Sequence, residues 1–85
     1  MNEHTKELIA IGAAAAVNCR PCLEHHWRSA MEAGVTATEA LEAAEVGLTV
    51  NRGAAAGTRG YVREVIKDET RREQRADLSG CPCAD

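Results

Sequence analysis

Apolar residues recur every three or four positions along most of the chain, which is the spacing of an α-helix. This periodicity predicts helices at about residues 3–17, 21–33, 37–52 and 58–74. No strand is predicted beside them, so the pattern indicates an all-α fold.

Two of these helix boundaries carry their own sequence signals. Gly34 followed by the apolar Val35 is typical of a helix C-terminus, because glycine readily takes the left-handed conformation found there. The run from Thr36 to Glu39 has the spacing of a capping box and predicts the start of the next helix.

The C-terminal half of the chain is less regular. Gly53, Gly57 and Gly60 interrupt an Ala-rich stretch and predict a kink or break before the last helix. Beyond the charged end of that helix we expect a mobile tail over residues 76–85. The predicted organisation is therefore one helical domain over residues 1–75 followed by this tail.

The composition indicates a thin hydrophobic core. The 85 residues include one Trp, one Tyr and no Phe, and much of the apolar 45% is alanine. In the third predicted helix, Leu41, Ala44 and Leu48 lie along one stripe at helical spacing. A chain of this size buries only about 60–65% of its unfolded surface, so we expect association with further copies to complete the core.

The net charge and the N-terminal sequence indicate which partners and which cellular compartment to expect. A net charge of −3 gives no electrostatic case for nucleic acid or an anionic membrane as a partner. The polar N-terminus is followed by only a short Ala-rich apolar run, which does not have the form of a signal peptide. We expect a cytoplasmic protein whose partners are small molecules or proteins.

Cys19, Cys22 and His26 are the strongest chemical signal in the chain. On a helix these positions share one side, and the two cysteine Cα atoms would lie roughly 5 Å apart, within the range that a disulfide requires. Arg20 and the unpaired amides of a first turn opened by Pro21 would favour a negatively charged sulfur, and His26 could take or return its proton. The pattern predicts a redox-active dithiol, but not a thioredoxin fold, which requires strands around the motif.

The spacing of Glu7, Cys19, Cys22 and His26 resembles that of the redox-active members of the alkylhydroperoxidase D and carboxymuconolactone decarboxylase superfamily. These members carry Glu, eleven residues, and then Cys-x-x-Cys-x-x-x-His. The sequence around the motif is similar as well, so the resemblance covers roughly residues 3–60. It implies an all-α core that assembles as trimers or hexamers, and peroxide-reducing or disulfide-exchange chemistry.

The resemblance also implies a role for each residue of the motif. Cys22 would be the peroxidatic thiol and Cys19 the resolving thiol, with His26 and Glu7 as a proton relay to them. A hydroperoxide would be the substrate, a dithiol or a protein would be the reductant, and no cofactor or metal would be needed. From spacing alone, contact between Glu7 and His26 requires either crossed helices or a neighbouring subunit.

Two other functional classes fit the same residues. In a soft-metal-binding or metal-sensing protein, Cys19, Cys22 and His26 would act as ligands together with Cys81 and Cys83 of the tail. In the other class, the chain would be a non-catalytic subunit of a larger redox assembly. For the tail cysteines themselves, three interpretations compete: a disulfide shuttle to the CxxC, a metal site, and no role.

Overall fold

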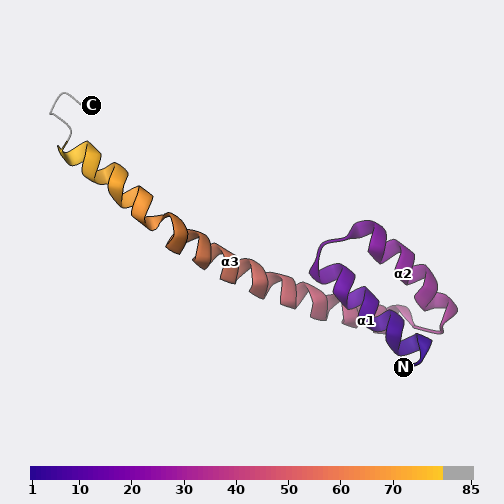
Figure 1. Ribbon diagram of the computed structural model, residues 1–85. Coiled ribbons are helices and arrows are strands. Elements are labelled where there is room, and N and C mark those ends of the chain that lie inside the picture. The colour runs from indigo at the N-terminus through magenta and orange to yellow at the C-terminus, as the bar shows by residue number, and fades with distance from the viewer. Residues whose placement is uncertain (80–85) are drawn as a thin grey trace. The chain divides into compact units, whose positions relative to one another are not determined.

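The structure is a computed structural model that describes residues 1–79, with the side chains at 68, 70 and 76–79 left out. The described chain forms three helices, α1 (Glu3–Ala16), α2 (Arg20–Glu32) and α3 (Ala37–Ser79), and contains no strand (Figure 1). The all-α prediction is therefore confirmed.

The chain divides into two compact units. The first, Met1–Ala54, contains α1, α2 and the beginning of α3. The second begins at Ala55, and its described part consists of the remainder of α3. All residues predicted to form the redox site lie in the first unit.

Asn18 closes α1 and leads the chain directly into α2. It adopts a φ of 57°, in the left-handed region that asparagine tolerates better than most residues. Its N–H donates to the Ala15 carbonyl at 3.2 Å, and the next N–H, of Cys19, donates to the Ala14 carbonyl at 3.0 Å. This pair of bonds is the Schellman arrangement, and it fixes the position of Cys19 at the end of α1.

The turn between α2 and α3 follows the signals in the sequence. Gly34 has a φ of 85°, and the Val35 N–H donates to the Ala30 carbonyl at 2.9 Å, which completes a second Schellman arrangement. The Thr36 hydroxyl accepts from the Glu39 N–H at 3.1 Å, and the Glu39 carboxylate accepts from the Thr36 N–H at 2.9 Å. Both predicted helix boundaries are confirmed.

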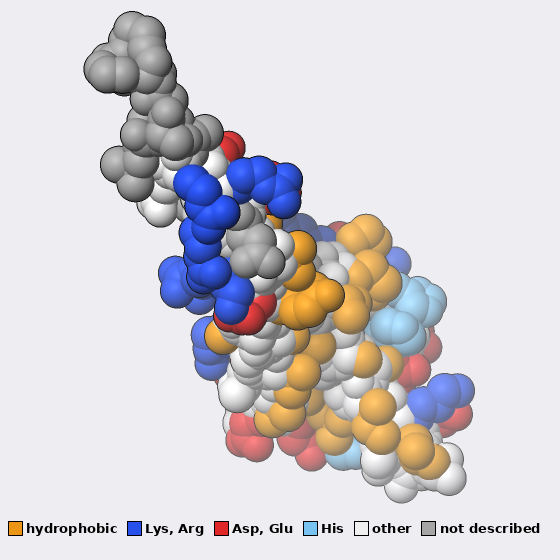
Figure 2. All heavy atoms as spheres, turned by 60° about the vertical axis from the view of Figure 1, so that its left-hand side comes forward, with side chains coloured by type: hydrophobic (Ala, Val, Ile, Leu, Met, Phe, Trp, Pro, Cys, Tyr) orange, Lys and Arg blue, Asp and Glu red, His pale blue; other side chains and the backbone are white. Residues whose placement is uncertain are grey.

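The core of the first unit is small. Its buried centre consists of Ile11 from α1, Ala30 from α2 and Val35 from the turn before α3. The partly buried residues packed against this centre are Leu8, Leu23, Trp27, Ala40, Ala43 and Ala44. Many larger apolar side chains remain at the surface, as Figure 2 shows.

The helices α1 and α3 meet through small residues rather than through leucine. A Cβ on Gly12 would lie 3.2 Å from the Ala43 carbonyl oxygen, and one on Gly47 would overlap the Gly12 carbonyl. Leu41 and Leu48 of the same helix remain 67% and 36% exposed, so the contact is made by the small residues.

Side-chain hydrogen bonds tie both ends of α1 to α3. Near its start, His4 Nε2 lies 3.1 Å from Glu39 Oε1, and near its end the Asn51 amide donates to the Ala16 carbonyl at 2.8 Å. That carbonyl belongs to the last turn of α1, where no helical partner is available to it. The two helices therefore run in the same direction, with the Gly12–Gly47 approach between the two ties.

The predicted break in the C-terminal half was wrong, because α3 runs without interruption past Gly53, Gly57 and Gly60. A glycine inside a helix costs about 1 kcal/mol relative to alanine, but it ends the helix only where the backbone turns into a cap. Among the described glycines only Gly34 has a positive φ. The helix also continues through residues 76–79, while Cys81 and Cys83 lie outside the described residues.

Candidate active site

A disulfide joins Cys19 and Cys22 where α2 begins. Their Cα atoms lie 5.2 Å apart, in agreement with the distance expected from the motif's spacing. Both side chains are half-buried, so the disulfide is partly accessible to solvent. A reactant could reach it without unfolding of the helix.

Cys19 stabilises both the end of α1 and the start of α2. Its N–H closes α1, and its side chain is the N-cap of α2, where Sγ accepts a hydrogen bond from the Cys22 N–H at 3.3 Å. Pro21 occupies the first turn of α2, which suits its fixed φ. The Cys19 sulfur therefore lies at the positive end of the helix dipole.

Glu7 and His26 form a direct contact between α1 and α2. His26 Nδ1 lies 2.9 Å from Glu7 Oε2, and only 7% of Glu7 is exposed. An ionised carboxylate can only accept, so Nδ1 donates and Nε2 remains available to exchange a proton. The contact is made within one chain by helices that pack on each other, and it needs no neighbouring subunit.

His26 and Cys22 share a face of α2, since four residues separate them. The adjacent His25 is exposed, and its ring meets that of His26 edge-on with centroids 4.8 Å apart. His25 therefore lies at the rim, as the helical spacing predicts. The Glu7–His26 contact therefore joins α1 to the helix that carries Cys22.

A shallow apolar hollow of about 410 Å³ adjoins the same helix. Its lining includes Ile11, Leu23, Trp27 and Leu41, with Glu24 as the charged member. Leu23 and Trp27 directly follow Cys22 and His26 in the sequence, so the hollow opens on the neighbouring face of α2. No local sequence pattern predicts this hollow, because its lining residues come from three helices.

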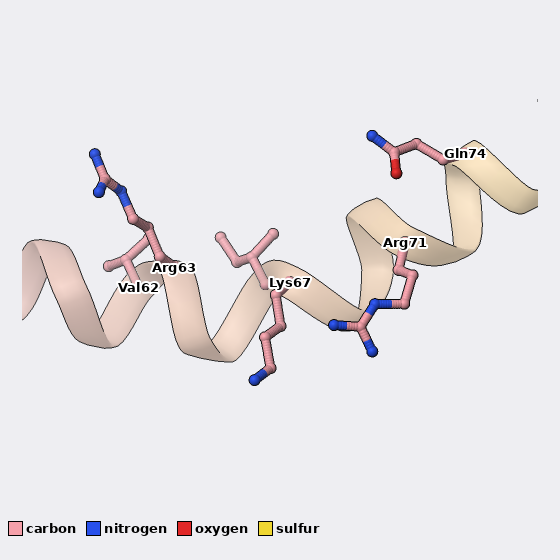
Figure 3. A pocket seen from close by; sticks show the side chains of 6 residues that line it. Val62, Arg63, Lys67, Arg71 and Gln74 are labelled. Atoms are coloured by element: carbon pink, nitrogen blue, oxygen red, sulfur yellow. The ribbon is translucent and has the colours of Figure 1, made fainter.

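A second hollow lies on the C-terminal part of α3 and is not a binding site in this chain alone. Its lining residues, from Val62 to Gln74, all come from a single helix. Figure 3 shows Arg63 and Gln74 extending to one side of that helix, and Lys67 and Arg71 to the other. One helix cannot enclose a ligand, so this hollow is an open surface of α3.

Among the side chains that the structure describes, no group of three or more His, Cys, Asp or Glu is arranged to hold a metal ion. In that same part of the chain, no helix combines the length and the apolar character that crossing a membrane requires.

The fold and the site together define an all-α domain with a CxxC disulfide at a helix N-terminus and a buried Glu–His pair beside it. The model of the carboxymuconolactone decarboxylase family matches residues 1–64, and the chain belongs to this family. The Cys19–Cys22 pair is consistent with the redox-active branch that carries a CxxC. No curated protein and no solved structure matched the chain.

Proposed function

We propose that this protein reduces hydroperoxides, or exchanges disulfides, through the Cys19–Cys22 dithiol. The observation that supports this most directly is the bond between the buried Glu7 carboxylate and His26, on the helix that carries Cys22. A buried carboxylate that orients an imidazole is a common way to prepare a base for a nearby nucleophile.

In the oxidative half of the cycle, His26 Nε2 accepts the proton of the Cys22 thiol. The thiolate attacks the outer oxygen of the hydroperoxide, the O–O bond breaks, and the alkoxide leaves as an alcohol with the proton returned by His26. Cys22 becomes a sulfenic acid. The Cys19 sulfur then attacks the Cys22 sulfur, which releases water and forms the disulfide that the structure contains.

The cycle requires an external reductant, since each peroxide consumed leaves one disulfide to be reduced. A dithiol or a protein thiol supplies the two electrons. Such reductants are maintained in reducing compartments, so we place the reaction in the cytoplasm.

We also propose that the protein works as a homo-oligomer, as a trimer or a hexamer. Five apolar residues of the described chain are buried and three of them are alanines, whereas large side chains on α3 such as Leu41, Val50 and Tyr61 are more than half exposed. Exposed apolar surface on this scale indicates a protein interface. A mass measured by light scattering at the monomer value would contradict this part of the proposal.

Serine variants of the two cysteines test the assignment of the chemistry. Cys22→Ser should abolish peroxide consumption, while Cys19→Ser should accumulate a sulfenic acid on Cys22 that dimedone traps. The readouts are the peroxide remaining with time and the mass of the cysteine-bearing peptide. An unchanged rate in Cys22→Ser would contradict the proposal.

The two adjacent histidines provide a matched control for the proton relay. His26→Gln should lower the rate of peroxide consumption by about a hundredfold, which is within the usual contribution of a general base. His25→Gln, one position away and exposed, should retain the rate. Equal losses in both variants would show that the helix was disturbed and that no specific relay exists.

A further inference from the structure

We infer that the two sulfurs have different roles when the disulfide is reduced: the incoming thiol bonds to Cys22, and Cys19 is released as the thiolate. The inference rests on the proposed redox function. It specifies which of the two sulfurs the reductant attacks when the disulfide is reduced.

The geometry distinguishes the two sulfurs. Cys19 Sγ accepts the Cys22 N–H at 3.3 Å and lies at the N-terminus of α2. Both features stabilise negative charge on that sulfur. Cys22 itself lies inside the first turn of the helix, and no described hydrogen bond is donated to its sulfur.

The position of Cys19 is also fixed from both sides. Its N–H is held by the Ala14 carbonyl, and its own carbonyl accepts the first bond of α2 from the Leu23 N–H at 3.0 Å. The hydrogen bond to its sulfur comes from backbone, so it does not depend on which side chain occupies position 22. The sulfur is therefore held at the cap before the S–S bond breaks.

Thiol–disulfide exchange is faster when the sulfur that leaves is the better-stabilised thiolate. In the first step an external thiolate attacks Cys22 Sγ, an S–S bond forms between them, and the Cys19 thiolate leaves. In the second step another thiolate attacks the reductant's sulfur in this mixed disulfide. The Cys22 thiolate then leaves and takes a proton, and the two external thiols end as one disulfide.

The assignment gives His26 a second use. The mixed disulfide forms on Cys22, which shares the His26 face of α2. A protonated His26 can therefore neutralise the Cys22 thiolate as it leaves in the second step. Oxidation and reduction would then use the same proton donor on the same sulfur.

Trapping of the mixed disulfide tests the inference. Full-length oxidised protein carrying Cys81→Ser and Cys83→Ser is mixed with glutathione and quenched with N-ethylmaleimide, and the peptide that contains both cysteines is sequenced by tandem mass spectrometry. We expect glutathione on Cys22 and maleimide on Cys19 in about tenfold excess over the reverse arrangement. Equal amounts, or the reverse preference, would overturn the inference.

Alkylation of the single-cysteine variants provides a second measurement. In Cys22→Ser the backbone donor at position 22 remains, so Cys19 should reach half of its maximal alkylation rate at a lower pH than Cys22 does in Cys19→Ser. The opposite order would also overturn the inference. Neither measurement contains peroxide, so failure to consume peroxide would contradict the peroxidase part of the proposed function without changing the order of the two sulfurs measured here.

Discussion

The two units of the chain differ in how their residues are held. In Met1–Ala54, helices are joined by a buried core, by the Glu7–His26 bond and by a backbone approach between two glycines. From Ala55 onward, every side chain whose exposure is described is exposed. Two ion pairs described there, Lys67–Glu64 and Arg72–Glu69, each join residues three positions apart.

The difference indicates where function can reside in a chain this short. The Glu7–His26 contact needs side chains from two helices held at a fixed distance, and packing between those helices provides this. A helix stabilised by neighbours three residues away can extend an interaction surface, but it cannot position a reacting group. Basic side chains gathered along the C-terminal part of α3 are visible in Figure 2.

The largest effect is expected from the buried carboxylate of the first unit. Glu7→Gln keeps a hydrogen-bonding side chain but removes the charge, and the rate of peroxide reduction should fall by about a hundredfold. The rate is measured by steady-state kinetics at a single pH.

Glu3→Gln is the matched control for this variant. Glu3 lies on the same helix, but its described partner is Lys6, 3.8 Å away at the surface. Its rate should match that of the unmodified protein. An equal loss of rate in both variants would contradict a specific role for the Glu7 carboxylate.

The contact between Glu7 and His26 marks the limit of what the sequence could predict. The identity of both residues follows from the family motif, and the disulfide spacing follows from helical geometry. Whether α1 and α2 cross closely enough within one chain depends on Ile11, Ala30 and Val35, whose packing no local pattern determines. The motif could be predicted, and its assembly within a single chain could not.

The next effect, on stability, should come from the approach of α1 to α3. Gly47→Ala places a Cβ against the Gly12 carbonyl and within 3.0 Å of the Ala15 Cβ. Overpacking of this kind costs typically about 1–3 kcal/mol, and the free energy of unfolding in urea should fall accordingly. An unchanged urea midpoint would mean that the two helices do not meet at Gly47.

The same substitution in the second unit should have the opposite sign. A Cβ on Gly57 would meet nothing within 4 Å, so Gly57→Ala should add helix stability of roughly 0.5–1 kcal/mol. Circular dichroism during thermal unfolding measures the change. A loss of stability would show that another surface, such as a second copy of the chain, approaches the helix at Gly57.

The helix boundaries show the same division between local and distant causes. The turn at Gly34 and the capping box from Thr36 to Glu39 were predicted correctly, because caps depend on neighbouring residues. The exposure of Leu41 was not predicted, because the close approach of Gly47 to α1 decides which face of α3 meets that helix. Local chemistry determines where helices end, and distant packing determines which face is buried.

The smallest effect concerns pH. The pKa of Glu39 is lowered from its ordinary value of 4.5, first by the Thr36 backbone N–H and then by the hydrogen bond with His4. A carboxyl group whose pKa is lower when folded stabilises the protein above its unfolded pKa, and this stability is lost as pH falls through the folded value. Unfolding midpoints of the unmodified protein and of Glu39→Gln should therefore differ near neutral pH and converge in acid below pH 4.5.

Gln at position 39 can still form the capping box, so the comparison isolates the charge. A difference that persists unchanged into acid would contradict the assignment. The effect should be small, because the carboxyl group is exposed to solvent.

The most direct test of the redox assignment is to follow the cysteine pairing with time. Reduced, metal-free protein is treated with one equivalent of a hydroperoxide, and the disulfides are mapped by peptide mass spectrometry. We expect the Cys19–Cys22 disulfide to form much faster than free cysteine oxidises under the same conditions. Oxidation of both thiols at the rate of free cysteine would contradict it.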